Sequence, residues 1–476
     1  MMEWAEWHLL TDASRTTDAE SGAVSADTVR RASVTIAATA KVKRVANRAG
    51  KEGAGDRRQG GARPAWLPRL YYGWVMLLAL GWTQITSWGI LYYAFSVFVT
   101  PMADDLGWSR AAITGAFSVA LLCSGLTALL VGRWVDQHGP RLVMSAGSCL
   151  AALLLVAWSR VDQLLLFYLI WAGIGATTAA VFYEPAFAAV ATWFVRYRSR
   201  ALTILTFLGG LASVIYIPLA AWLVRDYGWR TAIVVLAMLL AVLTIPPHLL
   251  LLRRRPSDLG LLPDGEVPVA EAEAERPVEV SVSAREAIRS RSFRWLATAF
   301  CLAFLVNVAV TVHLIPYLLE AGFSAGFAAS AAGLVGLMAM PGRLIFTPLG
   351  GRIPRRYITV MIFAVQAVAL VALVTIPTRL GVGIFVALFG VGFGAITPAR
   401  AAFMAELYGP QHYGSISGVL ALLVTLARAL GPVTAGLLYG VWSGYVPVLW
   451  ACAGVALAAA AAAYLIEPPA RSRLAV

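Results

Sequence analysis

Three arginines lie inside long apolar stretches of this chain: Arg343, Arg400 and Arg428. A charged side chain at the centre of a bilayer costs about 2.5 to 3.5 kcal/mol on insertion scales, so it usually has a partner or lines a pathway. A guanidinium stays protonated at physiological pH and presents a planar set of donors to a carboxylate. These arginines therefore indicate an anion-binding site or ion pairs between helices, and none of them is suited to carry a proton.

The depth of two of these arginines leaves alternatives open. Arg343 lies about seven residues from the end of its stretch, so its long side chain could also extend to the membrane interface. Arg428 lies about a dozen residues into its stretch, where an ion pair with a neighbouring helix is the alternative to a bound anion.

The composition is that of a membrane protein. Of 476 residues, 59% are apolar and 13% charged, and the mean hydropathy is +0.74, whereas about a quarter of the residues of a soluble protein are charged. The net charge of +13 is explained below by arginines at the ends of apolar stretches, so it does not indicate nucleic acid. The four cysteines are isolated, which argues against disulfides and a metal site.

Twelve apolar stretches are long enough to cross a bilayer, which takes about 20 helical residues for a core of roughly 30 Å. The fold class predicted is therefore all-α, with twelve transmembrane helices in two six-helix bundles. The expected spans are 72–99, 111–131, 142–159, 164–194, 201–224, 231–252, 295–319, 327–349, 357–377, 380–405, 415–440 and 446–466.

Basic residues fix the expected orientation, because loops on the cytoplasmic side are enriched in Lys and Arg. With the N-terminus inside, 30 basic residues lie inside and five outside. We expect a bacterial inner (plasma) membrane protein with both termini cytoplasmic. The expected divisions are a disordered tail over 1–70, a first bundle over 71–252, a cytoplasmic linker over 253–294, a second bundle over 295–466 and a cytoplasmic end over 467–476.

The two halves echo each other in sequence. Gly173-Ile174-Gly175-Ala176 in the fourth stretch matches Gly392-Phe393-Gly394-Ala395 in the tenth, and Gly132-Arg133 matches Gly351-Arg352. Parallel six-helix repeats occur in one large class of secondary transporters, which hold the substrate between the halves near the midplane.

The connection between the second and third stretches carries a motif: Gly132, Arg133, Asp136, Gly139 and Arg141. It resembles the G-x-x-x-D-x-x-G-x-[RK] loop of the major facilitator superfamily. The glycines permit a tight turn and close helix approach, and the carboxylate of Asp136 can meet a helix N-terminus or an arginine and latch one conformation. An ordinary polar turn is the alternative.

Further stretches are similar to bacterial members of the monocarboxylate and oxalate/formate transporter group. They are Trp88-Gly89-Ile90-Leu91-Tyr92-Tyr93-Ala94-Phe95, Tyr183-Glu184-Pro185-Ala186-Phe187, Trp193-Phe194-x-Arg196-x-Arg198, His313-x-x-Pro316-Tyr317 and Pro341-Gly342-Arg343. The resemblance implies a transporter of small organic anions that works by proton symport or anion exchange, with no cofactor.

The resemblance also implies roles for two arginines. Monocarboxylate transporters pair a helix-eight arginine with the substrate carboxylate, and Arg343 lies at that place. Their aspartate four residues earlier is Ala339 here, and their helix-one lysine has no counterpart, which counts against their proton-coupling scheme. Oxalate/formate exchangers use one cation on helix eight and one on helix eleven, which Arg343 and Arg428 match by helix number.

Two embedded groups change charge in the physiological range or near it: Glu184 and His313. Each is a candidate for proton coupling, although His313 could instead cap a polar interface. Glu184 lies on the repeat partner of the stretch that carries Arg400. We expect these two side chains to meet across the halves and close the inner gate, with a hydrogen bond of Glu184 within its own half as the alternative.

Polar and aromatic residues on the first, fourth and seventh stretches are expected to line the central site with Arg343, Arg428 and His313. They are Gln84, Trp88, Tyr92, Tyr93, Tyr183 and Asn307. Aromatic rings with polar tips suit a small amphipathic acid, although Trp and Tyr also anchor helices at the membrane interface.

The function predicted is secondary transport of a small carboxylate, with a proton or a counter-anion as the coupled partner. There is no phosphate-binding loop and no catalytic constellation, so ATP drive and enzyme activity are not expected. One alternative is drug or metabolite efflux by proton antiport, whose usual G-P-x-x-G-G signature is replaced here by Gly209-Gly210 and Pro218. A second alternative is a non-transporting membrane sensor.

Overall fold

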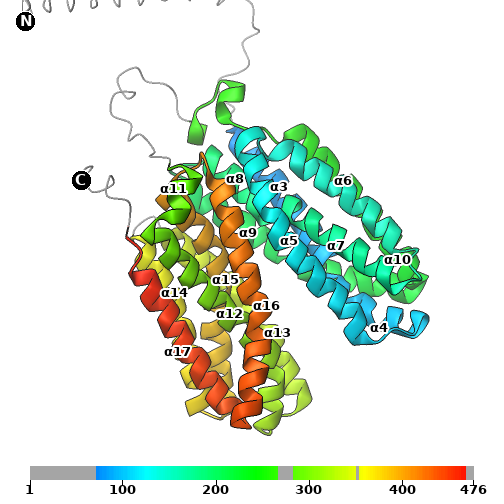
Figure 1. Ribbon diagram of the computed structural model, residues 1–476, viewed down its shortest axis with the longest axis vertical. Coiled ribbons are helices and arrows are strands. Elements are labelled where there is room, and N and C mark those ends of the chain that lie inside the picture. Colours follow the sequence, from blue (N-terminus) through cyan, green and yellow to red (C-terminus); the bar gives the residue numbers. More distant parts are fainter. Residues whose placement is uncertain (1–70, 266–281, 350–352, 468–476) are drawn as a thin grey trace, which may run out of the picture. The chain divides into compact units, whose positions relative to one another are not determined.

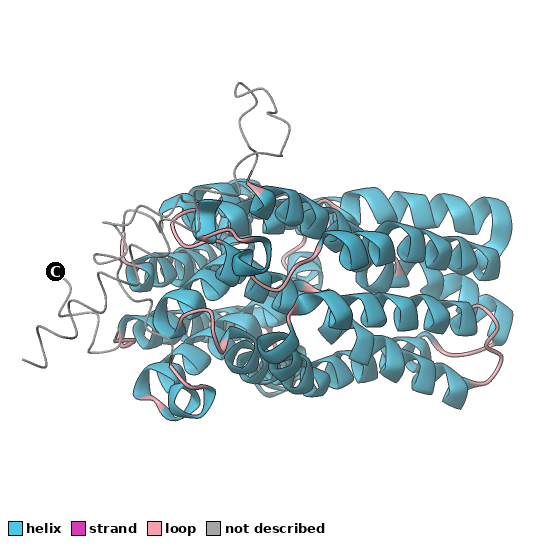
Figure 2. Ribbon diagram, turned by 90° about the horizontal axis from the view of Figure 1, so that it is seen from above, coloured by secondary structure: helices cyan, strands magenta, loops and turns pink. Residues whose placement is uncertain are grey.

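The computed structural model describes residues 71–265, 282–349 and 353–467, and within these ranges the regular structure is helical (Figure 2). The predicted all-helical class is thereby confirmed. The predictions for the tail over 1–70 and for Gly351 and Arg352 concern residues outside the described ranges.

The first half of the bundle runs from α3 to α10. Its elements are α3 (Tyr72–Trp88), η1 (Gly89–Tyr93), α4 (Phe95–Leu106), α5 (Arg110–His138), α6 (Pro140–Trp158), α7 (Leu164–Val181), α8 (Tyr183–Trp193), α9 (Arg198–Gly210) and α10 (Ala212–Leu251). Two short turns, η2 (Pro256–Leu259) and η3 (Pro263–Gly265), follow in the connection to the second half.

The second half contains six long helices and a short one before them. They are α11 (Ala284–Arg289), α12 (Arg291–Glu320), α13 (Ala325–Leu349), α14 (Arg355–Thr375), α15 (Arg379–Tyr408), α16 (Tyr413–Trp442) and α17 (Tyr445–Tyr464). Figure 1 shows α3 to α10 on one side and α12 to α17 on the other.

Within the described ranges, eleven helical segments are long and apolar enough to cross a membrane. One of them, Arg198–Leu251, has 54 residues, about twice what a bilayer crossing needs. Its backbone reverses at Gly228, whose φ of 76° and ψ of 161° are not helical. A residue without a Cβ is required there. This segment therefore supplies two crossings, and the predicted twelve crossings are accounted for.

The helix of the fourth crossing is broken into α7 and α8, which no pattern in the sequence predicted. Phe182 separates α7 from α8 with an extended backbone, φ −81° and ψ −157°. Pro185 follows in the first turn of α8 and has no N–H to donate to the carbonyl of Val181. The Gln84 side chain replaces that donor, since its Nε2 lies 2.8 Å from the Val181 oxygen and 3.3 Å from the Phe182 oxygen. The break turns the following Tyr183 and Glu184 toward the centre of the molecule.

The first crossing contains a π-helical turn, η1, between α3 and α4. Its wider turn is closed by the Ala94 N–H, which donates to the Gly89 oxygen at 2.8 Å. A Cβ on Gly89 would lie 2.2 Å from the ring of Tyr216, so only glycine allows this crossing to pack against the fifth. Single π turns often mark functional sites, and this one directs Tyr92 and Tyr93, which are consecutive, into the same cavity.

The repeat seen in the sequence recurs in the packing of the two halves. A Cβ on Gly175 would lie 2.0 Å from the Ala120 oxygen, where the fourth crossing meets the second. Its counterpart Gly394 relates in the same way to the Ala339 oxygen at 1.8 Å, where the tenth crossing meets the eighth. The two glycines thus support equivalent close helix crossings, as expected for parallel repeats.

The halves are joined at the end of the helices that carries the connection between α10 and α12, which we call the linker face. Helix α5 packs against α16, and α9 against α13. A Cβ on Gly132 would lie 2.1 Å from the Gly414 oxygen, and one on Gly418 would lie 2.4 Å from the Ala128 oxygen. Small residues therefore bring the backbones of α5 and α16 into direct contact.

Candidate functional site: a cationic cavity between the two halves

The loop motif caps a helix of the opposite half. Asp136 accepts hydrogen bonds from the backbone N–H groups of Gly414 and Ser415, each at 2.7 Å. These groups begin α16, where the helix dipole favours a negative charge. The prediction that Asp136 meets a helix N-terminus agrees with this contact, and its role as a latch stays a prediction.

The other motif residues differ in what they contact. Gly139 has a φ of 80° and lies against Arg254, which donates to the Asp136 backbone oxygen at 3.4 Å. Arg133 and Arg141 are exposed. The motif therefore acts at the interface through its carboxylate and its glycines.

The corresponding connection in the second half uses the opposite charge. Arg355, at the start of α14, donates from Nη2 to the Ser199 hydroxyl of the first half at 2.8 Å. Its Nε lies 2.6 Å from a carboxylate oxygen of Glu406 at the end of α15. In the sequence, Arg355 lies four residues after Gly351, as Asp136 lies four residues after Gly132. An arginine that links α9, α14 and α15 therefore stands where the first half has its acid.

Above these contacts, a cavity of about 380 Å³ lies between the halves. Its walls come from α3 with η1, α5, α7 with α8, α9, α12, α13, α15 and α16. All three embedded arginines border it, together with Glu184, which leaves an excess of two positive charges. Ligand sites of small molecules usually have volumes of about 300–1,000 Å³, so this cavity suits a small solute.

Arg343 enters the cavity from α13 and also touches the opposite half. Its Nη1 donates to the Thr206 backbone oxygen of α9 at 2.5 Å. A Cβ on Gly210 would lie 2.0 Å from the same Nη1, so this glycine makes room for the guanidinium. The Nε of Arg343 is buried and has no hydrogen-bond partner among the described residues. The alternative that Arg343 extends to the membrane interface does not agree with this position.

Arg428 enters the same cavity from α16. Its guanidinium carbon lies 5.4 Å from the centre of the Phe304 ring on α12, within the range of a cation–π contact. None of the described carboxylates forms an ion pair with Arg428 or with Arg343. The alternative of an ion pair between helices therefore finds no support for Arg428.

Arg400 is the paired arginine of the cavity. Its Nη2 donates to Oε1 of Glu184, and the hydroxyl of Ser417 donates to Oε2 of the same carboxylate. Glu184 belongs to the first half, whereas Arg400 and Ser417 belong to the second. The expected contact between Glu184 and Arg400 is present, and the alternative of a Glu184 bonded within its own half is not. Their role in gating or proton coupling stays a prediction.

An aromatic cluster forms one wall of the cavity. The rings of Trp88 and Phe182 stack with 4.0 Å between their centres, and Trp88 also contacts Tyr92, Tyr93 and Tyr183. The Tyr183 hydroxyl lies against Gly209 of α9. The predicted aromatic lining is therefore in place, with Phe182 added by the break in the fourth crossing.

Asn307 borders the cavity, but its amide is used within the second half. It exchanges two hydrogen bonds with the Gln366 amide, at 2.9 and 3.3 Å, and donates to the Ala303 oxygen at 2.6 Å. Both side-chain amides are about 1% exposed. This amide pair fixes α12 against α14, so Asn307 has little capacity left for a ligand.

Two residues predicted to bind substrate do not border the cavity. Gln84 is fully buried and its Nε2 serves the break between α7 and α8. His313 lies between the Tyr445 hydroxyl and the Pro432 oxygen, at 3.1 Å from each. The structure does not bring either residue to the central cavity, because helical periodicity does not show which side of a buried helix faces it. A part for them in substrate binding stays a prediction.

Several residues at or beside the cavity could not be predicted from the sequence. Thr425 and Phe304, which border the cavity, and Ser417, which donates to Glu184, carry no signal that separates them from the other small or apolar residues of their helices. Phe182 and Gly209 follow from backbone features, a helix break and a close approach, which are visible only in the structure.

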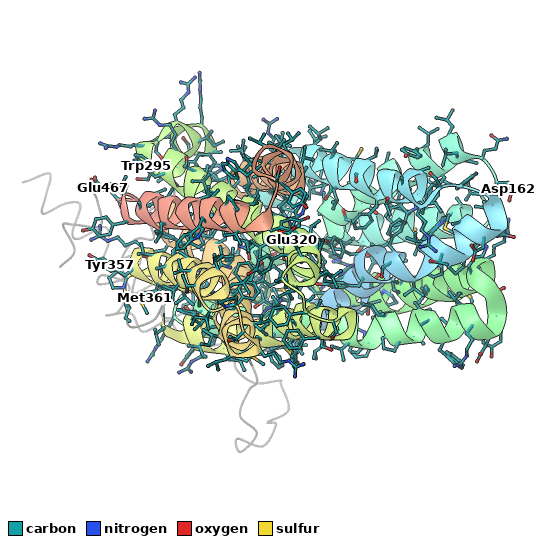
Figure 3. The ribbon with its side chains drawn as sticks, turned by 90° about the horizontal axis from the view of Figure 1, so that it is seen from below. Asp162, Trp295, Glu320, Tyr357, Met361 and Glu467 are labelled. Carbon is teal, nitrogen blue, oxygen red and sulfur yellow. The ribbon has the colours of Figure 1, made fainter. Side chains whose placement is uncertain are left out.

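One ion-pair cluster of the first half lies away from the cavity. Arg230 bridges Asp105 and Asp162, and Asp162 lies at the edge of the first half, far from the second (Figure 3). Within the same ranges, no three side chains of the His, Cys, Asp or Glu type gather in a way that could hold a metal ion. The central cavity is therefore the site with a distinct chemistry.

Comparison with known proteins agrees with this architecture. A family model described as Major Facilitator Superfamily matches residues 77–432. Monocarboxylate transporter 13 of Bos taurus is 22% identical over 378 residues, which cover 79% of this chain and 84% of that protein. The oxalate:formate antiporter of Oxalobacter formigenes is 23% identical over 335 residues, 68% of this chain and 75% of that protein.

Solved structures extend the agreement to the fold. The crystal structure of the E. coli transporter FucP in the outward conformation has a TM-score of 0.63 and 15% sequence identity, and the match covers 83% of this chain and 99% of FucP. The predicted resemblance to the superfamily is confirmed, and the relatives are membrane transport proteins rather than enzymes. With its multi-pass helical bundle and the match over most of its length, this chain belongs to the Major Facilitator Superfamily.

Proposed function

We propose that the protein moves a small organic anion, a monocarboxylate or a dicarboxylate, across the bacterial inner membrane by alternating access. The two halves, α3 to α10 and α12 to α17, would rock around the central cavity, so that the cavity opens first to one side of the membrane and then to the other. The cavity is small and strongly cationic, which suits a compact carboxylate.

The observation that carries this proposal is the pair Arg343 and Arg428. Both border one cavity, and neither has a carboxylate partner among the described residues. An unpaired guanidinium is costly to keep in the membrane interior, so a site for an anionic solute explains why two are retained. Similarity to proteins named as a monocarboxylate transporter and an oxalate:formate antiporter supports the same class.

The arrangement of the contacts supports a particular state of the transport cycle. The hydrogen bonds of Asp136, Arg355 and Arg343 join the halves between the linker face and the cavity. The enrichment of arginine on that side supports a cytoplasmic position for the linker face. The conformation would then be outward-facing, with the anion entering from the periplasm and release requiring separation at Asp136 and Glu184.

Two coupling modes follow from the chemistry of the cavity. In proton symport, protonation of Glu184 would weaken its ion pair with Arg400 and allow the linker face to open. In anion exchange, the charge of the substrate would be needed for each reorientation, and Glu184 would stay ionised. Drug efflux is less suited to this site, because broad apolar cavities serve it better than two unpaired guanidinium groups.

Uptake into proteoliposomes tests the proposal directly. The purified full chain would be supplied with labelled lactate, pyruvate, formate and oxalate, with and without an inward proton gradient and with and without unlabelled anion inside. We expect uptake of at least one of these anions, stimulated by either the gradient or the internal anion. Loss of uptake in Arg428→Gln, with unchanged insertion of the protein, would support the assigned site. Absence of transport for all four anions under every condition would contradict the proposal.

A further inference from the structure

A second, smaller cavity opens from the wall of the central one. It has a volume of about 80 Å³ and lies between the first, second and fourth crossings, with α16 at its mouth. It shares Trp88, Phe182, Thr425 and Arg428 with the central cavity, among other residues. The two spaces therefore adjoin each other at Arg428.

The inner walls of this side pocket are mainly apolar side chains, although the buried indole N–H of Trp171 has no acceptor among the described residues. They are formed by Leu91, Phe117, Ala120, Leu121, Trp171 and Ile174, none of which borders the central cavity. The rings are rigidly packed, since Phe117 stacks on Phe95 at 4.8 Å and lies 5.8 Å from the centre of Trp171. A pocket held open by stacked rings does not collapse easily, and filling it with apolar groups of a ligand is favourable.

The polar groups lie at the mouth. Arg428 borders both spaces, and the indole N–H of Trp88 has no acceptor among the described residues. A carboxylate placed at Arg428 would therefore lie at the entrance, with any chain attached to it directed either into the central cavity or into the apolar pocket. The polar mouth and apolar interior together match an amphipathic anion.

We infer that the side pocket binds the alkyl tail of the transported anion, so that the protein prefers short-chain aliphatic monocarboxylates over oxalate and formate. This inference rests on the proposed function and refines it. An apolar protein cavity of about 150 Å³ holds benzene, so a pocket of about 80 Å³ admits a tail of about two or three carbons and excludes a ring. Each buried methylene contributes roughly a four-fold gain in affinity.

A homologous series of carboxylates tests this inference. Binding of acetate, propionate, butyrate, valerate and hexanoate to the purified full chain would be followed by tryptophan fluorescence, since Trp88 and Trp171 border the pocket. We expect affinity to rise about four-fold with each added methylene up to propionate or butyrate, whose tails have two and three carbons, and then to stop rising.

Two variants change the pocket in opposite directions. Ala120→Val fills it and is expected to remove the dependence of affinity on tail length. Phe117→Leu widens it and is expected to move the optimum to a longer tail, which keeps the test informative if the first variant is unstable. Leu169→Phe is the matched control, because Leu169 lies on α7 with 61% of its surface exposed and away from the pocket.

The outcomes separate the two proposals. If acetate binds but tail length has no effect, or if the same slope persists in Ala120→Val, the side pocket is not a tail site and the organic-anion function stands. If no carboxylate of any length binds or is transported, the proposed function fails and the inference fails with it.

Discussion

Glu184 and Arg400 form an ion pair across the two halves of the bundle, although 216 residues separate them in the chain. Both oxygens of the Glu184 carboxylate are held by the second half, one by Arg400 and the other by Ser417. The side chain of Arg400 is 8% exposed and that of Glu184 is 21% exposed. Both residues border the central cavity.

Replacing Glu184 by glutamine should favour the state in which the linker face is open. Breaking a buried ion pair by removing one partner costs about 3–5 kcal/mol, and the partial exposure of Glu184 places the effect near the lower limit. The closed population should fall by about 100-fold. Spin labels at Gln137 and Gln411, in a chain whose native cysteines are serine, would report the distance between the halves at the linker face.

The same variant separates the two coupling modes. Under proton symport, uptake by Glu184→Gln should lose its dependence on the proton gradient. Under anion exchange, pH dependence should match that of the natural chain and only the rate should change. If the distances between the spin labels are the same in Glu184→Gln as in the natural chain, Glu184 does not hold the linker face closed.

Replacing Arg428 by glutamine should weaken anion binding without loosening the fold. Arg428 forms no ion pair with a described residue, so its replacement breaks none. Hydrogen bonds from its guanidinium to a carboxylate should contribute about 1.5–3 kcal/mol to the binding free energy. The affinity for a carboxylate should therefore fall by about ten- to hundred-fold. Arg428→Lys should restore part of it, because the charge remains and the planar pair of donors is lost. Titration by tryptophan fluorescence measures all three proteins.

Arg343 should behave differently from Arg428 when it is replaced. Arg343→Gln removes the contact with the Thr206 oxygen as well as a cavity charge. Both the affinity for the anion and the closed population should fall, whereas Arg428→Gln should change the affinity alone. An unchanged distance between the spin labels in Arg343→Gln would show that its contact with α9 does not stabilise closure.

Replacing Asp136 by asparagine should weaken closure by a smaller amount than the loss of Glu184. The carboxylate accepts two backbone hydrogen bonds at the start of α16, and an amide retains one acceptor without the charge. A loss of about 1–2 kcal/mol corresponds to a five- to thirty-fold fall in the closed population. Asp104→Asn, on an exposed position of α4, serves as the control and should leave the distances unchanged.

Replacing Gly132 by valine should prevent closure altogether. Even the Cβ would lie 2.1 Å from the Gly414 oxygen, which is backbone and cannot move aside without separating α5 from α16. Transport should be abolished while the protein still inserts and folds. Gly454→Ala is the matched control, because nothing lies within 4 Å of a Cβ there. Transport at the natural rate by Gly132→Val would show that the two helices do not need to touch.

Replacing Gln84 by leucine should destabilise the first half rather than alter the affinity for the anion. The carbonyl oxygens of Val181 and Phe182 would lose the Nε2 donor, and an unsatisfied buried group costs about 1–3 kcal/mol. The thermal unfolding temperature should fall, and carboxylate affinity per folded molecule should stay within a factor of two or so. A loss of carboxylate affinity in Gln84→Leu at an unchanged unfolding temperature would show that Gln84 contributes to anion binding.

Much of the architecture follows from local properties of the chain. Apolar stretches of about 20 residues must be helical in a membrane, because every backbone polar group has to find its partner within the segment. The count of crossings, the loop motif around Asp136 and the pairing of Glu184 with Arg400 were all accessible by this reasoning and by the repeat. Charge in an apolar segment also pointed to Arg343 and Arg428 before their surroundings were known.

Other features depend on contacts between segments far apart in the chain. The break at Phe182 needs the Gln84 amide as a donor from another crossing, and the π turn at Gly89 needs the ring of Tyr216 close to its backbone. These two irregularities aim Glu184, Tyr92 and Tyr93 at the cavity. In the second half, Gln366 satisfies Asn307.

The sequence by itself determined which segments cross the membrane and which charges have to be accommodated there, because the cost of an unpaired polar group in lipid depends on the residue alone. Only the tertiary structure decided which of those groups face the same space. A helix that is apolar on all sides carries no periodic signal of its buried face. The sequence therefore could not show that Gln84 and His313 lie away from the cavity, or that Arg343 enters it rather than extending to the membrane interface.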